Sequence, residues 1–331
     1  MGTNLPEAVK NLTEPITKLV ETIAAGIGKI YEPTHIERMA KAKAKEIYII
    51  TDAMRNNTDI PIKYANSVVS LDASDVNELA SRAAMRLGNQ ELKKQQNIEN
   101  VILKTKKELE LVDEVSEDPV EPDWATRFMN SIEDVSNNEM QEVWSKILAG
   151  EIKRPKSFSL RTLECVKNLS PEEANLFQML SQYFVSVSNE KVFLPREKDL
   201  LAKYDITYDQ IIKLGDCGLI NIDTGLSLEK KLSKDDRHYN IYNDRILIDV
   251  ECGDDASERN CSLWLYRLTG IGAELYKAIG QKTNDSYMID YAKELKKRMS
   301  ASHLSVSAYN IIGFSEDGIS CEKNNLIAGT K

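Results

Sequence analysis

An acidic segment with two prolines divides the chain. Residues 113–124, DEVSEDPVEPDW, hold six acidic side chains besides the two prolines. Proline lacks the N–H that helix and sheet interiors require, and closely spaced carboxylates repel one another. Residues 113–123 are therefore predicted to be a linker that ends an N-terminal helical region over residues 1–112. Since 331 residues exceed what one hydrophobic core usually serves, two or three domains are expected.

The N-terminal region is predicted to be helical and to contain one long helix. Apolar residues recur at helical spacing over residues 12–30 and again over residues 75–115. The second stretch ends in a coiled-coil-like seam whose members step by four, three, four and three positions: Ile98, Ile102, Thr105, Leu109 and Val112. A helix of this kind packs lengthwise against another helix or against a second subunit, so a homo-oligomer is expected.

Residues 124–189 are predicted to form a central small helical bundle of four short helices. The strongest local signal is SPEEA, in which Ser170 caps a helix, proline occupies its first turn and Glu173 completes a capping box. Gly150 is predicted to end the second of the four helices, and Pro155 is predicted to prevent its resumption.

A basic turn, KRPKSFSLR, follows that second helix. Its cations are Lys153, Arg154, Lys156 and Arg161. Cations next to the exposed N–H groups of a helix N-terminus can bind phosphate or carboxylate, so these four residues are predicted as an anion-binding site. The favoured alternative is that they interact with the last carbonyls of the preceding helix and stay solvated.

Beyond residue 189, short helices are mixed with strand-like runs. Residues 190–280 contain a helix pair, a strand that begins near Gly218, a hairpin and a helix capped by Thr269, an order that resembles a winged-helix domain. Residues 281–331 are expected to be a C-terminal helix and tail. The expected fold class is therefore mainly α: an N-terminal helical region with a long helix, a central small helical bundle and a C-terminal α+β winged-helix-like domain.

The winged-helix-like region lacks the composition of a DNA reader. Its expected recognition helix, residues 207–216, contains Lys213 but also the acidic residues Asp209 and Asp216. It is poor in the arginine and amide side chains that read bases. Five cations are predicted as a basic wing, although acidic residues lie among them: Lys230, Lys231, Lys234, Arg237 and Arg245. The formal charge of −9 also disfavours general nucleic-acid binding, so a packing role is favoured.

The sequence shows no catalytic, metal-binding or cofactor motif. P-loop, GxGxxG, HExxH and GxSxG patterns are absent, and the five cysteines and three histidines have no zinc-type spacing. An enzyme is therefore disfavoured, and neither a metal nor a cofactor is expected. The sequence shows no signal-peptide pattern and no apolar run of about 18 residues, so a cytoplasmic protein without a transmembrane segment is expected.

Three segments together carry a resemblance to a bacterial family: residues 5–33, residues 142–163 (EVWSKILAGEIKRPKSFSLRTL) and residues 168–177 (NLSPEEANLF). They resemble an uncharacterised domain-of-unknown-function family whose members are often encoded on prophages and mobile elements. A weaker similarity, limited to about residues 139–180, is to the abortive-infection alpha proteins. The resemblance implies a cytoplasmic bacterial protein concerned with phage resistance, and it brings no catalytic residues with it.

The expected function is that of a non-enzymatic interaction protein, a sensor or effector in phage defence that acts through helical surfaces on a phage or host protein. The alternative is a winged-helix DNA-binding regulator. Nucleic acid is the less favoured partner because of the acidic total charge.

Overall fold

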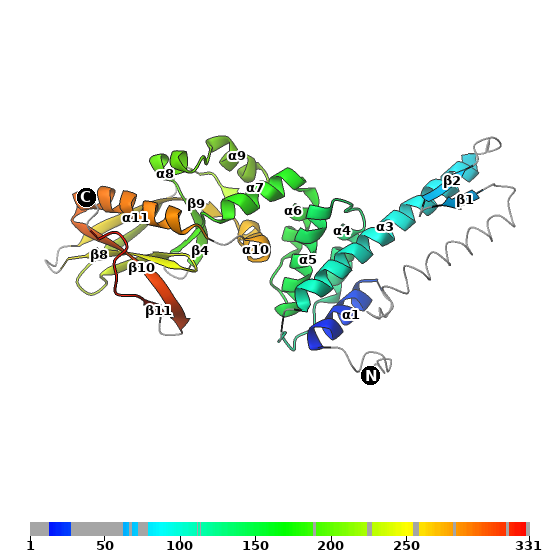
Figure 1. Cartoon of the computed structure of the whole chain (residues 1–331), viewed down its shortest axis with the longest axis horizontal. Coiled ribbons are helices and arrows are strands. Elements are labelled where there is room, and N and C mark those ends of the chain that lie inside the picture. Colours follow the sequence, from blue (N-terminus) through cyan, green and yellow to red (C-terminus); the bar gives the residue numbers. More distant parts are fainter. Residues whose placement is uncertain are drawn as a thin grey trace. The chain divides into compact units, whose positions relative to one another are not determined.

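The computed structural model describes residues 13–27, 62–65, 68–71, 79–110, 112, 114–187, 190–223, 227–253, 258–280, 283–315 and 318–328. The chain forms two compact units, residues 1–167 and 168–331 (Figure 1). The division between them falls inside the range 124–189 that was predicted to be one central domain.

In the described residues of the first unit, the regular structure consists of helices and one short hairpin. Its elements are α1 (Glu14–Ile27), β1 (Ile62–Ala65), β2 (Val68–Leu71), α3 (Leu79–Leu109), α4 (Pro122–Ile132), α5 (Asn138–Lys153) and α6 (Leu160–Asn168). Helix α3 lies along α5, and α1 packs on α4, so helices from both sides of residues 113–123 share one core. Residues 114–121 have neither helix nor strand structure, as their prolines and charges require.

The long helix was predicted correctly, and its seam has an intramolecular partner. Ile102, Thr105 and Leu109 are buried, and the Thr105 hydroxyl lies 3.4 Å from the backbone carbonyl of Ser145 on α5. Within the described part of the chain the seam therefore packs against α5 of the same molecule. Residues 86–91 of α3 are exposed, and Leu87 among them is 53% accessible.

The second unit is built on a large antiparallel sheet. The strands are β3 (Val185–Val187), β4 (Glu190–Pro195), β5 (Ile220–Asn221), β6 (Ser227–Leu232), β7 (His238–Tyr242), β8 (Ile246–Cys252), β9 (Arg259–Leu268), β10 (Leu304–Ser315) and β11 (Gly318–Cys321). Their order is β11-β10-β8-β7-β3-β4-β9-β5, with β6 also paired to β9. The helices are α7 (Pro171–Ser181), α8 (Lys198–Lys203), α9 (Tyr208–Asp216), α10 (Gly270–Ile279) and α11 (Asp285–Met299).

The prediction of a mainly α chain with a winged-helix-like C-terminal domain is wrong, because the second unit is mainly a nine-stranded sheet. Strands β3, β10 and β11 lie outside the predicted 190–280 domain, and residues 281–331 contain two strands as well as a helix. The period-two pattern of β10, in which Leu304, Val306 and Ala308 are buried, was overlooked because the residues between them, Ser305 and Ser307, are not typical strand formers. Helix α11 lies against β10 and β8 (Figure 1).

The start of α7 was predicted correctly from its local sequence, unlike the fold class. Both bonds of the predicted capping box are present at the start of α7, where the Ser170 hydroxyl accepts from the Glu173 N–H and the Glu173 carboxylate accepts from the Ser170 N–H. Gly150, however, does not end α5, which continues to Lys153. A Cβ on Gly150 would lie 2.7 Å from Cε2 of Phe158, so this glycine serves close packing instead.

Candidate interaction surface

Strand β9 directs a tryptophan outward from the sheet of the second unit. Its neighbours Leu263 and Leu265 are fully buried, whereas Trp264 between them is 42% exposed. This alternation follows from the pleat of the strand, which sends successive side chains to opposite faces. The sheet holds β9 on both sides, because Ser227 of β6 pairs with Trp264 and Pro195 of β4 pairs with Leu265.

Arg298, in the last turn of α11, is stacked on this tryptophan. Its guanidinium carbon lies 4.5 Å from the centroid of the Trp264 ring. One guanidinium nitrogen, Nη1, donates to the carbonyl of Ser262 at 2.8 Å, and Nη2 lies 3.1 Å from Oε1 of Glu197, the N-cap residue of α8. A planar cation above an indole face forms a favourable cation–π pair. Through its contacts with Glu197, Ser262 and Trp264, Arg298 also links α11 to the start of α8 and to β9.

A second arginine–aromatic pair adjoins the first. The backbone N–H of Arg196 donates to the carbonyl of Trp264 at 2.9 Å, and its guanidinium lies 5.7 Å from the ring centroid of Tyr266. Burial raises the pKa of Tyr266, while Arg196 opposes that rise and nearby Tyr208 adds to it. Tyr208, the first residue of α9, is 56% exposed. We name these residues the Trp264 surface, in which Tyr266 is only 4% exposed and is therefore buried: Arg196, Tyr208, Trp264, Tyr266 and Arg298.

Burial raises the pKa values of several groups that lie close to this surface. Desolvation raises the pKa of the Glu197 carboxyl, and the neighbouring Arg298 opposes that rise. Burial also raises the pKa of the Cys261 thiol to about 11, so the thiol stays protonated at neutral pH and is a poor nucleophile. The phenols of Tyr287 and Tyr291 are fully buried, their pKa values are raised by desolvation, and neither hydroxyl has a hydrogen-bond partner among the described residues.

The predicted anion site lies on the first unit and is organised by a residue that the sequence analysis missed. All four of its cations are exposed: Lys153, Arg154, Lys156 and Arg161. The buried carboxylate of Glu151 accepts hydrogen bonds from the backbone N–H groups of Lys156 at 2.6 Å and Phe158 at 3.0 Å. Since Glu151 already accepts from these N–H groups, an external anion would have to be bound by the four cationic side chains alone. The anion-binding site stays a prediction.

Four of the five predicted wing cations lie next to carboxylates. Lys230 is 2.8 Å from Asp236, Lys231 is 3.7 Å from Glu258, Arg237 is 2.8 Å from Glu251, and Arg245 is 3.1 Å from Asp285. Lys234 is exposed in the bend between β6 and β7. Lys230 and Lys231 are adjacent in β6 and therefore point to opposite faces of the sheet. The structure thus pairs these cations with acids rather than gathering them into one basic face.

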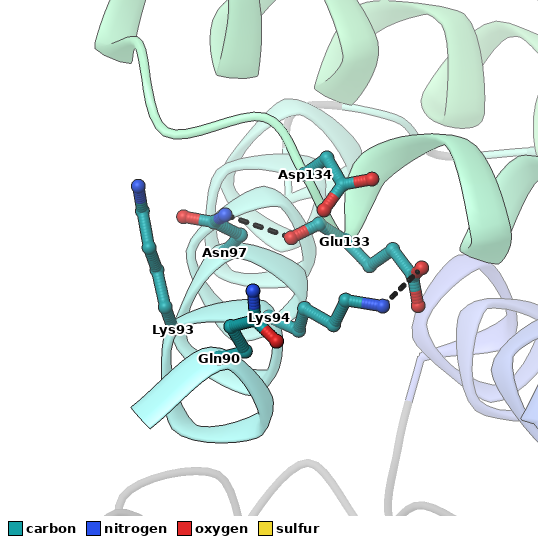
Figure 2. Close-up of a pocket in the computed structure, with 6 residues that line it drawn as sticks. All are labelled: Gln90, Lys93, Lys94, Asn97, Glu133 and Asp134. Atoms are coloured by element: carbon teal, nitrogen blue, oxygen red, sulfur yellow. Dashed lines mark hydrogen bonds and ion pairs between the residues drawn. The ribbon is translucent and has the colours of Figure 1, made fainter. Parts of the chain in front are cut away.

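A polar pocket of about 330 Å³ lies on the first unit, between α3 and the α4–α5 turn (Figure 2). Its lining residues are Gln90, Lys93, Lys94, Asn97, Glu133 and Asp134. Lys94 forms a 2.7 Å ion pair with Glu133, and the Asn97 amide donates to the Glu133 carbonyl at 2.8 Å. Two cations face two carboxylates, so the pocket selects neither an anion nor a cation, and it lacks the apolar lining of most ligand sites.

Two further properties concern the described residues only. No helix among them combines the length and the apolar character needed to cross a bilayer. Nor does any group of three or more histidine, cysteine, aspartate or glutamate side chains in those ranges have an arrangement that could hold a metal ion.

The chain was compared with families of known sequence, with curated proteins and with solved structures. A family model described as "Protein of unknown function (DUF2806)" matches residues 81–292. No curated protein and no solved structure matches the chain. The matched range includes Arg196, Tyr208, Trp264 and Tyr266 of the Trp264 surface, whereas Arg298 lies beyond it.

Proposed function

The chain belongs to the DUF2806 family of proteins of unknown function, and we propose that it is a non-enzymatic interaction protein that binds a partner protein through the Trp264 surface. We place it in the bacterial cytoplasm and in phage defence, because these are the settings implied by its resemblance to families encoded on prophages and to abortive-infection proteins. A phage or host protein is the proposed partner, together with self-association of the chain.

The exposure of Trp264 carries the proposal. The chain has three tryptophans; Trp124 and Trp144 are 3% and 0% exposed, whereas Trp264 is 42% exposed on a well-packed strand. Tryptophan, tyrosine and arginine are the side chains most enriched among residues that dominate binding energy at protein interfaces. A tryptophan that is already held against an arginine loses little conformational entropy when a partner covers it.

A DNA-binding regulator is the alternative, and one observation favours it. Exposed aromatic rings such as Trp264 and Tyr208, with Arg196 beside them, can stack on the bases of a single strand. Against it stand the ion pairs that occupy most of the predicted wing cations, and the formal charge of −9.

The test is co-purification with the tagged full-length chain from infected and uninfected bacterial cells. Trp264→Ala combined with Tyr208→Ala should abolish capture of a protein that the wild type retains. The matched control is Ile312→Ala with Phe314→Ala, two residues of β10 that are 71% and 56% exposed and should leave capture unchanged.

Three outcomes contradict the proposal: equal capture by both double variants, capture lost on nuclease treatment, or bound nucleic acid whose affinity falls steeply with salt. The last two would favour the regulator. Light scattering at several concentrations tests self-association, which predicts a mass above the 37.4 kDa of one chain.

A further inference from the structure

The polar pocket of the first unit has two walls that are joined by a buried hydrogen bond. Glu133 and Asp134, which follow the last residue of α4, form one wall. Asn97, on the α3 wall, is only 5% exposed, and its side-chain nitrogen donates to the Glu133 carbonyl at 2.8 Å and to the Ser136 hydroxyl at 3.3 Å. The α3 wall consists of residues that recur every three or four positions and therefore share one helix face: Gln90, Lys93, Lys94 and Asn97.

The four charges of the pocket comprise one ion pair and two groups without an ion-pair partner. Lys94 and Glu133 lie 2.7 Å apart and neutralise each other. Lys93 and Asp134 have no hydrogen bond or ion pair in the part of the chain that the structure describes. Figure 2 shows Lys93 on one side of Asn97 and Asp134 on the other, and the Asn97 oxygen points away from Glu133. The pocket thus offers one cation and one carboxylate from different walls.

We infer that the polar pocket binds a small zwitterion, a free α-amino acid whose carboxylate pairs with Lys93 and whose ammonium pairs with Asp134. A simple anion or a simple cation would be attracted by one of these groups and repelled by the other. A molecule that carries both charges presents each of them to its complement. The Asn97 oxygen is an additional acceptor for the ammonium, because its amide nitrogen already donates to two protein acceptors. This inference concerns the first unit and does not rest on the proposed function.

The size and the polarity of the pocket restrict the amino acid. Its volume of about 330 Å³ is near the lower end of the range of roughly 300–1,000 Å³ that is typical of small-molecule sites. All six lining residues are polar or charged, so an apolar side chain would find no apolar surface to bury against. Glycine, serine, asparagine and glutamine therefore match the pocket, whereas phenylalanine should bind no more tightly than glycine. Since Lys93 and Asp134 are exposed, water and salt screen their charges, and dissociation constants in the millimolar range are expected.

Equilibrium dialysis of radiolabelled glycine, serine, asparagine and glutamine, each against the full-length chain, measures the binding. Acetate and methylammonium, which carry one charge each, should not displace the labelled amino acid at concentrations at which the unlabelled amino acid does. Lys93→Met and Asp134→Asn should each weaken binding about tenfold, because each removes one charge-assisted contact.

The matched controls are Lys107→Met and Asp123→Asn, which change exposed residues of α3 and α4 that do not line the pocket. Both controls should bind the amino acid as the wild type does. Circular dichroism establishes that each variant is folded; if one pocket variant does not fold, the other still tests the site.

Four results would overturn the zwitterion site. They are the absence of binding by all four amino acids at millimolar concentration, displacement by acetate or methylammonium alone, unchanged binding in folded Lys93→Met and Asp134→Asn, and equal loss of binding in the pocket variants and the controls. The proposed function fails separately, because Trp264→Ala combined with Tyr208→Ala should abolish partner capture and leave amino-acid binding unchanged.

Discussion

Trp124 donates its indole N–H to the backbone carbonyl of Phe158 over 2.8 Å, across 34 residues of the chain. Phe158 is buried, its ring lies against Gly150, and its own N–H is bonded to the Glu151 carboxylate. The basic turn at residues 153–161 is thus fastened to the helical core through Phe158, while its cations face the solvent.

Glu151→Gln is expected to destabilise the first unit. The carboxylate is 2% exposed and accepts from the Lys156 and Phe158 N–H groups, and an amide would keep at most one of these bonds while presenting its own N–H to the other. A loss of about 2–3 kcal/mol in the free energy of unfolding is expected for charge-assisted bonds of this kind. Urea denaturation measures it, with the exposed Glu172→Gln as control; equal stability of the two variants would contradict the role given to Glu151.

Gly272→Ala and Gly270→Ala should differ sharply although both lie in the first turn of α10. A Cβ on Gly272 would stand 2.0 Å from the Leu219 carbonyl oxygen, a backbone atom, whereas a Cβ on Gly270 meets nothing within 4 Å. The clash in Gly272→Ala should lower the free energy of unfolding by about 1–3 kcal/mol or more. Gly270→Ala should be neutral or slightly stabilising, since alanine favours helix. Thermal melting of the two variants decides the matter, and an unaffected Gly272→Ala protein would refute the close approach.

The two buried phenols of α11 should be dispensable for stability. Tyr287 and Tyr291 have no hydrogen-bond partner for their hydroxyls among the described residues, so Tyr→Phe at either position should change the free energy of unfolding by less than about 0.5 kcal/mol or stabilise the protein. The matched control is Tyr204→Phe, which removes a 2.7 Å bond to Asp290 and should cost about 1 kcal/mol. A large loss in Tyr287→Phe or Tyr291→Phe would reveal a partner for that hydroxyl.

The capping box of α7 should make stability depend on pH. The backbone N–H of Ser170 bonds to the Glu173 carboxylate and is the main cause of the lowering of its pKa below the usual value of 4.5. A carboxyl whose pKa is lower in the folded state stabilises the fold above the usual pKa, and this contribution is lost as the pH falls through the folded value. Glu173→Gln should therefore reduce the difference in unfolding free energy between pH 7 and pH 3, and an identical pH profile would speak against the cap as its source.

Local contacts explain what the sequence determined by itself. The capping residues Ser170 and Thr269 were recognised because each bonds to an N–H three residues away, so all the atoms involved lie in one short segment. The long helix over residues 79–109 was evident for a similar reason, since its apolar seam repeats within the helix itself.

Only the tertiary structure decided the sheet and the candidate surface. Strand β4 pairs with β9, and β8 with β10, over separations of many tens of residues, and a period-two pattern does not specify which partner a strand will take. The exposure of Trp264 and the stacking of Arg298 on its ring depend on the neighbours that the assembled sheet supplies. Helix capping is encoded locally because its hydrogen bonds close within one turn, whereas strand pairing and surface exposure arise only when distant segments meet in the folded chain.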